Sequence, residues 1–264
     1  MGVYTSEVGV ISNIKVNLSG RVALITGAAR GVGRYLALSM ALDGADLVLI
    51  DKDLEPLEKV AEEVRRLGRR VLAIKADVSK WGDVYRAVEE AVKVFGRIDI
   101  LVNNAGIEGP FDFVENISEE DWDAVINVNL KGAFLCVKAV VPYMKKQGYG
   151  RIVNVASVAG VEGNAKMTPY CAAKAGMIGL TKALAEELAP YGIRVNVVAP
   201  ALIEGTALTD RLPKEQREFL ARKIPLGRLC KLHEVADLIK FLASDAADFL
   251  TGYVHILAGG RARA

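Results

Sequence analysis

Residues 26–33 read Thr-Gly-Ala-Ala-Arg-Gly-Val-Gly. They follow directly on an apolar run at 21–26 and lead into a segment of helical periodicity at 31–42. A strand, a glycine-rich turn and a helix in this order form the first unit of a nucleotide-binding α/β fold. We therefore predict that this stretch begins such a fold and that the turn binds phosphate groups.

The glycines of this turn have separate tasks. Glycine is needed where a chain turns sharply, where its backbone approaches a pyrophosphate and where a helix packs closely on a sheet. Gly27, Gly31 and Gly33 can fill these three places, with Arg30 and Val32 between them. The N-terminus of the next helix offers free N–H groups and a positive dipole end to the phosphates. The turn is thus a candidate dinucleotide site.

The rest of the chain repeats the same alternation of strand and helix. Short runs rich in Val, Ile and Leu are separated by longer segments of helical periodicity, which is typical of βαβ units. The expected strands are 21–26, 46–50, 70–75, 98–102, 151–155, 193–198 and 253–257. Right-handed crossovers place the helices on both faces of one sheet. We predict an α/β fold: a single doubly wound (Rossmann) domain with a seven-stranded parallel sheet at residues 18–264, after a loose N-terminal extension at 1–17.

Composition excludes several classes of protein. Of the 264 residues, 52% are hydrophobic and 25% are charged, which is typical of a globular protein. The formal net charge is only +2 and is spread along the chain, so nucleic acid is not an expected partner. The N-terminus lacks a secretory signal and no apolar run approaches the ~18 residues of a membrane span, so we expect no membrane and a cytoplasmic location. Cys136, Cys171 and Cys230 share no metal-like spacing, so neither a disulfide framework nor a metal site is expected.

An acidic residue indicates the cofactor. Asp51 ends the second strand, 24 residues after Gly27, where a carboxylate can accept hydrogen bonds from the ribose hydroxyls of NAD. Arg30 argues for NADP, because a guanidinium beside the turn could pair with the 2′-phosphate. A carboxylate at the ribose would repel that phosphate, whereas Arg30 need not repel NAD. We therefore predict NAD in preference to NADP.

A tyrosine and a lysine form the candidate catalytic pair. Tyr170 and Lys174 are four residues apart and so project from one face of a helix. Tyrosine has an ordinary pKa of about 10, and a nearby cation favours its ionised form. Ser157 follows the strand at 151–155, and ligands of open α/β sheets bind beyond such carboxyl ends. The three side chains can therefore meet in one crevice.

Together these residues resemble the short-chain dehydrogenase/reductase family over roughly residues 18–260. The resemblance includes the glycine turn, Asn103-Asn104-Ala105-Gly106 after the fourth strand, Asn129 and the residues of the candidate crevice. It implies an enzyme that transfers hydride between a nicotinamide cofactor and a secondary alcohol or ketone. It implies that Tyr170 gives or takes the hydroxyl proton and that Ser157 binds the substrate oxygen. Lys174 would bind the nicotinamide ribose and lower the pKa of Tyr170, and Asn129 would hold a proton-relaying water.

Further cofactor contacts are also implied by the resemblance. They come from Asp77, Val78, Asn104, Ala105, Gly106, Tyr170, Lys174, Pro200, Ile203 and Thr206. Two departures from the family pattern stand out. Pro200-Ala201 replaces Pro-Gly, with the expected threonine displaced to Thr206 behind Gly205. Ala258-Gly259-Gly260 replaces Asp-Gly-Gly.

Three functions remain open. Polar residues after Ser157, namely Glu162, Asn164 and Lys166, favour a small hydroxylated or anionic substrate. The alternative is an NADPH-dependent 3-oxoacyl-thioester reductase acting on acyl carrier protein. Such enzymes present basic residues at the rim, where this chain has Tyr191 and, nearby, Gln147. A non-catalytic dinucleotide-sensing binding protein is the third hypothesis.

The expected assembly is a homotetramer. The resemblance implies it, and the apolar residues of the segments 121–144 and 170–188 exceed one helix face. Part of each segment is thus expected to pack against a partner subunit.

Overall fold

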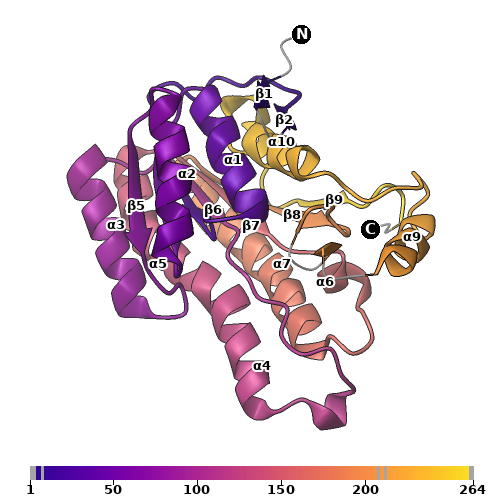
Figure 1. The fold of residues 1–264 in the computed structure, drawn as a ribbon. Helices are drawn as coiled ribbons and strands as arrows, with labels where there is room; N and C mark the ends of the chain where they lie inside the picture. Colours follow the sequence, from indigo (N-terminus) through magenta and orange to yellow (C-terminus); the bar gives the residue numbers. More distant parts are fainter. Residues whose placement is uncertain (1–3, 7–8, 207–208, 211–212, 262–264) are drawn as a thin grey trace.

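A seven-stranded parallel sheet forms the centre of the computed structural model, which describes residues 4–6, 9–206, 209–210 and 213–261 (Figure 1). The strands lie in the order β5-β4-β3-β6-β7-β8-β9, and every neighbouring pair is parallel. Their bounds are β3 Val22–Thr26, β4 Asp46–Asp51, β5 Val71–Lys75, β6 Ile100–Asn103, β7 Gly150–Val155, β8 Ile193–Pro200 and β9 Val254–Leu257. The predicted doubly wound fold is confirmed.

The central strands are apolar along their whole length because both faces of the sheet are covered. Every residue of β3, β6 and β7 is buried. Their near-continuous Val, Ile and Leu runs therefore suit a sheet between two helix layers. β8 extends past the predicted end at residue 198, since Ala199 and Pro200 pair with Ile256 and Leu257 of β9.

Helices lie on both faces of the sheet (Figure 1). One apolar layer packs α1, α2 and α10 against the sheet, and the other packs α3, α5 and the end of α7. The helices are α1 Gly31–Leu42, α2 Leu54–Arg66, α3 Trp81–Phe95, α4 Glu119–Ile126, α5 Gly132–Gln147, α6 Ala159–Glu162, α7 Thr168–Leu188, α9 Lys214–Arg222 and α10 Leu232–Leu242. Short 3₁₀ turns are η1 Val114–Asn116, η3 Ala189–Tyr191 and η4 Asp245–Ala247, and η2 Asn127–Lys131 is a π-helix.

The order of the strands positions the site. β3 lies between β4 and β6. After β3 the chain forms β4 and β5 on one side of it, and then crosses over to form β6 and the later strands on the other side. Connections at such a reversal diverge and leave a crevice beyond the carboxyl ends of the strands. The glycine turn follows β3 and the motif Asn103–Gly106 follows β6, so both lie at this crevice.

One helical segment is long and apolar. α4, η2 and α5 run on as a single helix, Glu119–Gln147, with a mean hydropathy of 1.6 in its most apolar 18-residue window. By length and composition this segment could cross a membrane, although the sequence suggested no such run. Half of that window is buried inside the fold, as in the core helix of a globular domain.

The N-terminal segment is anchored to the domain. β1 Tyr4–Ser6 and β2 Gly9–Ser12 pair as antiparallel strands. Ser12 is buried, its hydroxyl donates to the carboxylate of Asp237 on α10, and the backbone N–H of Asn13 donates to the same carboxylate at 3.0 Å. The expectation of a loose extension is therefore wrong for these residues, because buried hydrogen bonds attach them to α10. The domain boundary at residue 18 stays a prediction.

A buried lysine completes this attachment. The Lys240 ammonium lies 2.7 Å from a carboxylate oxygen of Asp43, and both side chains are fully buried. It also donates to the hydroxyl of Ser12 at 2.6 Å and to the carbonyl of Ile14 at 2.7 Å. These contacts of one ammonium join α10, the end of α1 and the N-terminal segment.

Replacing Lys240 with methionine is expected to lower the free energy of unfolding by about 3–5 kcal/mol, because the Asp43 carboxylate stays buried without its cation. Urea unfolding followed by circular dichroism measures this loss. The double variant Lys240→Met, Asp43→Leu should recover much of it, since an apolar pair replaces the charges. Arg66→Gln, which removes an exposed ion pair, serves as the control. A single Lys240→Met variant as stable as wild type would contradict the assignment.

Candidate active site

Two adjoining cavities open at the carboxyl ends of the strands. The first, here called the groove, has a volume of about 740 Å³ and runs along the glycine turn, the end of β4 and the end of β5. The second, here called the pocket, has a volume of about 230 Å³ and lies over the ends of β7 and β8 and the start of α7. Asn104, Gly106, Ile107, Glu108 and Thr206 line both cavities, so the two form one continuous site.

Almost all of the predicted site residues line these cavities. The groove is lined by Gly27, Arg30, Gly31, Asp51, Asp77, Val78, Asn104, Ala105, Gly106 and Thr206. The pocket is lined by Val32, Asn104, Gly106, Asn129, Ser157, Tyr170, Lys174, Pro200, Ile203 and Thr206. Gly33 lies underneath the turn, where a Cβ would come within 2.1 Å of the Gly27 carbonyl oxygen. Its role is therefore close packing, as the sequence suggested.

The geometry of the glycine turn suits a pyrophosphate. Gly27 and Gly31 have φ values of +65° and +54°, which other residues rarely adopt. A Cβ on Gly27 would lie 2.8 Å from the Ala105 Cα, whereas a Cβ on Gly31 would point into open space. α1 begins at Gly31, and within the described part of the chain no side chain caps it. Its first N–H groups are thus available to a phosphate, and the residues present fit a dinucleotide.

Asp51 is held in place at the edge of the groove. One of its carboxylate oxygens accepts from the backbone N–H of Ala29 at 3.1 Å, and the other accepts from that of Asp53 at 3.2 Å. Arg30 is already paired, because its guanidinium lies 2.5 Å from the carboxylate of Asp53. Asp53 was not among the residues predicted for the site. The sequence did show a second acidic residue two positions after Asp51, from which an additional carboxylate at this edge of the groove could have been predicted.

Asn104 connects the glycine turn to the end of β6. Its side-chain amide donates to the carbonyls of Thr26 and Gly27, both at 3.0 Å. In return, the hydroxyl of Thr26 accepts from the backbone N–H groups of Asn104 and Ala105, both at 3.1 Å. These bonds fix the turn and the β6 end relative to each other.

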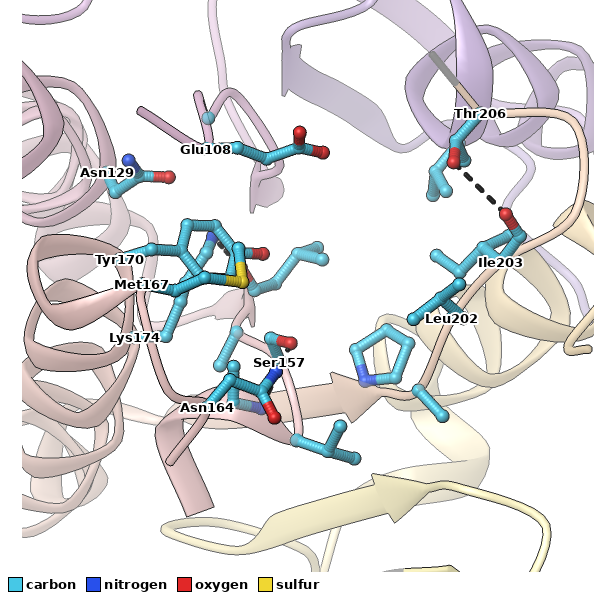
Figure 2. Close-up of a pocket in the computed structure, with 18 of the residues that line it drawn as sticks. Glu108, Asn129, Ser157, Asn164, Met167, Tyr170, Lys174, Leu202, Ile203 and Thr206 are labelled. Atoms are coloured by element: carbon cyan, nitrogen blue, oxygen red, sulfur yellow. Dashed lines mark hydrogen bonds between the residues drawn. The ribbon is translucent and has the colours of Figure 1, made fainter. Parts of the chain in front are cut away.

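The catalytic candidates meet in the pocket, as Figure 2 shows. Tyr170 and Lys174 lie on the first two turns of α7, and the ammonium of Lys174 is 5.6 Å from the centre of the Tyr170 ring. Ser157, which lies after β7, lines the same pocket, and its hydroxyl lowers the pKa of Tyr170. One helix and one strand end thus bring together the three side chains.

Burial controls the charges of this pair. It raises the pKa of Tyr170 to about 12, against a lowering effect of the Ser157 hydrogen bond, and the carboxylate of Glu108 raises it further. Burial lowers the pKa of Lys174 to about 8. The Lys174 ammonium donates to the Val155 carbonyl at 2.7 Å. Burial is thus the largest influence on the pKa of Tyr170, and the lowering by Lys174 that the resemblance implies stays a prediction.

Asn129 lies in the π-helix η2, a helical irregularity often found at functional sites. Its side-chain N–H groups donate to the carbonyls of Val125 at 2.9 Å and Ile107 at 2.8 Å. Its buried side-chain oxygen has no hydrogen-bond partner among the residues that the structure describes. A Cβ on Gly106 would lie 2.5 Å from this oxygen, so only glycine fits there. An acceptor of this kind can bind a water or a ligand donor.

The segment after β8 carries the displaced threonine. The Thr206 hydroxyl donates to the Ile203 carbonyl at 3.0 Å, and both residues lie across the cavity from Tyr170 (Figure 2). Thr206 therefore reaches the site in spite of its shift along the sequence. The backbone carbonyl of Pro200 accepts a hydrogen bond from the backbone N–H of Val158 at 3.0 Å, which fixes Pro200 at the end of β8.

Of the three polar residues expected to orient the substrate from the loop after Ser157, only Asn164 lines the pocket. Lys166 instead places its ammonium 4.2 Å above the Phe113 ring, and Glu162 pairs with Arg261 at 3.4 Å. The sequence analysis missed two charged residues of the pocket wall, Glu108 and Arg261. Glu108 lies two residues after the predicted motif at the end of β6 and was recognisable from it, whereas Arg261 reaches the pocket only through the fold.

Comparison with known proteins agrees with this geometry. The family model for short chain dehydrogenases matches residues 21–217. A 3-oxoacyl-[acyl-carrier-protein] reductase of Thermotoga maritima is 48% identical over 245 residues, covering 93% of this chain and 99% of that protein. A (2S)-[(R)-hydroxy(phenyl)methyl]succinyl-CoA dehydrogenase subunit of Thauera aromatica is 46% identical over 246 residues, covering 93% of this chain and 98% of that protein.

Solved structures of dehydrogenases and reductases share this fold. NAD+-bound xylitol dehydrogenase superimposes with a TM-score of 0.89 at 35% identity, covering 93% of this chain and all of that one, 100%. Levodione reductase superimposes with a TM-score of 0.89 at 37% identity, covering 93% of this chain and 98% of that one.

Replacing Tyr170 with phenylalanine is expected to lower kcat by at least about a hundredfold while cofactor affinity changes by no more than a few-fold. The change removes the proton donor of the pocket and leaves the groove intact. Steady-state rates and cofactor titration by fluorescence measure the two effects. Tyr191→Phe, at an exposed tyrosine outside both cavities, is the matched control. Activity above a tenth of wild type would refute the role of Tyr170.

Proposed function

This chain belongs to the short-chain dehydrogenase/reductase family, and on that premise we propose an NAD-dependent dehydrogenase whose substrate carries its hydroxyl or ketone oxygen β to an acyl carbonyl. The observation that carries the proposal is the meeting of Tyr170, Ser157 and Lys174 in a pocket continuous with the groove. The two relatives named above support the substrate class, because the names of both place the reacting oxygen β to an acyl carbonyl. The direct test is turnover of 3-hydroxyacyl and 3-oxoacyl compounds with each cofactor.

The residues of the pocket divide the chemical work. A bound nicotinamide ring would accept or supply the hydride. Tyr170 carries its proton at neutral pH, because its pKa is about 12, and can donate that proton to a ketone oxygen during reduction. Ser157 lies beside the same hydroxyl and can hold the substrate oxygen during the transfer. Lys174, with a pKa of about 8, is mostly a cation at neutral pH and would bind the nicotinamide ribose.

The groove supports NAD. Asp51 is oriented by two backbone N–H groups and lies where the ribose hydroxyls are expected. The cation that could favour NADP, Arg30, is paired with Asp53. A 2′-phosphate would thus meet Asp51 and would have to displace Asp53 from Arg30.

Reduction of an acyl group on acyl carrier protein is the second candidate. The rim position Tyr191 is not itself basic, but the Lys145 ammonium lies 4.1 Å above its ring. Positive charge therefore does reach this part of the surface and could attract an acidic carrier. Gln147, the last residue of α5, adds no positive charge to the rim. Its side-chain amide hydrogen-bonds the backbone N–H and carbonyl of Ile98. A non-catalytic dinucleotide sensor has less support, since the proton donor and its neighbours lie together in an open pocket.

We propose a homotetramer in the cytoplasm. Phe134 of α5 and Trp122 of α4 are 46% and 39% exposed, as is expected of helix faces that meet a partner. All three cysteines, each of them described, are free, which suits a reducing compartment.

Replacing Asp51 with alanine is expected to shift the ratio of kcat/KM values from NAD toward NADP. Hydrogen bonds to a charged group contribute ~1.5–3 kcal/mol, so wild type should prefer NAD by about tenfold or more. The variant loses these bonds and the repulsion of the 2′-phosphate. Asp53→Ala, which frees Arg30 but keeps Asp51, should shift the ratio less, and Glu55→Ala on the exposed face of α2 should not shift it. A wild-type preference for NADP would show that Asp51 is misplaced.

Light scattering at micromolar concentration is expected to give four times the chain mass of 28.4 kDa. Phe134→Asp should yield smaller species, because it places a charge on a helix face assigned to the interface. A monomeric wild-type mass would contradict the assembly.

A further inference from the structure

The C-terminal tail is folded so that one arginine enters the pocket wall. β9 ends at Leu257, and the chain then turns, with the backbone N–H of Arg261 donating to the Ala258 carbonyl at 3.0 Å. Gly259 and Gly260 have φ values of +58° and +90°, and a Cβ on Gly259 would lie 2.6 Å from Ile224. Only a Gly-Gly pair makes this turn against the Ile224 segment without strain. The turn places Arg261 among the residues that line the pocket.

The side chain of Arg261 is mostly buried, and its guanidinium is only loosely held. Its side chain is 17% exposed. The Nε atom lies 3.4 Å from a carboxylate oxygen of Glu162, and an Nη2 N–H donates to the Asn164 side-chain oxygen at 3.4 Å. Both contacts are longer than the ~2.7–2.9 Å of a strong charge-assisted hydrogen bond.

Arg261 therefore has unused donors. A guanidinium carries five N–H groups, and the two contacts above use one from each of two nitrogens. Among the described residues, no other partner of Arg261 is found. By contrast, Arg228 on the surface makes two short bonds to Glu234, at 2.6 and 2.8 Å. A cation that is mostly removed from water and incompletely paired favours an additional anion.

The two charged residues of the pocket wall, Glu108 and Arg261, have opposite charges. Figure 2 shows Asn164, the partner of Arg261, and Glu108 on opposite sides of the cavity, with Ser157 and Tyr170 between them. A negatively charged group would be repelled on the Glu108 side and attracted on the Arg261 side. The reacting carbon would then lie at Tyr170.

We propose that Arg261 determines substrate specificity by binding a carboxylate of the substrate, in addition to the hydroxyl or ketone that Tyr170 and Ser157 engage. This inference rests on the proposed function for the position of the reacting oxygen. Asn164 positions the guanidinium, and Glu162 competes with the incoming carboxylate. The substrate class is thus a 3-hydroxy or 3-oxo compound with a free acid group.

The test compares 3-hydroxybutyrate with its methyl ester, which lacks the negative charge and carries one additional methyl group. Wild type is expected to favour the acid in kcat/KM. Arg261→Gln should lower the acid-to-ester ratio by about tenfold to a hundredfold, mainly through the KM of the acid, since it loses hydrogen bonds to a charged group. Arg66→Gln, the same charge change on exposed α2, should leave the ratio as it is. A ratio unchanged in Arg261→Gln, or a wild-type preference for the ester, overturns the proposal.

Glu162→Gln separates binding from a purely structural ion pair. If Arg261 binds the substrate carboxylate, loss of the competing Glu162 charge should raise the acid-to-ester ratio several-fold. If the pair only holds the loop to the tail, Glu162→Gln and Arg261→Gln should lower activity on both substrates together, and the proposal fails.

A binding measurement distinguishes failure of this inference from failure of the proposed function. If neither compound is turned over, the proposed function is contradicted. Calorimetric titration of the Tyr170→Phe variant with NADH and acetoacetate, against methyl acetoacetate, then decides the role of Arg261. Tighter binding of acetoacetate that is lost on adding Arg261→Gln supports the proposal. Equal or absent binding of the two compounds overturns it.

Discussion

The close contact between the glycine turn and the end of β6 is the constraint on which the site depends. Gly27 lies so near Ala105 that a Cβ would come within 2.8 Å of its Cα, and Asn104 bonds the Thr26 and Gly27 carbonyls. The contact sets the depth of the groove under the first turn of α1. It also fixes Gly106, whose missing side chain leaves room beside Asn129 and Lys174. The groove and the pocket are therefore aligned by one set of backbone contacts.

Burial decides the charges of the two central groups of the pocket. The pKa of Tyr170 is raised and that of Lys174 is lowered, so both groups are moved toward their neutral forms. The nearby Glu108 carboxylate acts in the same direction on Tyr170. A positively charged nicotinamide beside these groups would act in the opposite direction and favour the tyrosinate. A cofactor bound in the groove would therefore favour alcohol oxidation in the pocket, which links the two cavities electrostatically.

The sequence predicted those features that depend on local pattern. Strands buried on both faces produce continuous apolar runs, and glycines needed for close approach occur at fixed spacing, so the sheet and the groove were recognisable. Contacts between distant residues leave no such pattern. Lys240 meets Asp43 and Ser12 across more than half of the chain, which is why the extension was expected to be loose. The same holds for Arg261 and Glu162, whose pairing depends on a turn after the last strand.

The residues proposed for catalysis and the arginine proposed for substrate specificity lie in different parts of this chain. The residues proposed to handle the proton and the cofactor all lie in the segment that the family model matches, which ends at residue 217. The C-terminal tail lies beyond it, and there Arg261 brings a charge to the pocket from a turn that Gly259 and Gly260 allow. High identity to an acyl-carrier-protein reductase does not by itself decide the substrate, because the charge of the pocket wall depends on single residues such as Glu108 and Arg261. A buried, underpaired guanidinium is a strong determinant of specificity, since a substrate without an anion would leave it unsatisfied.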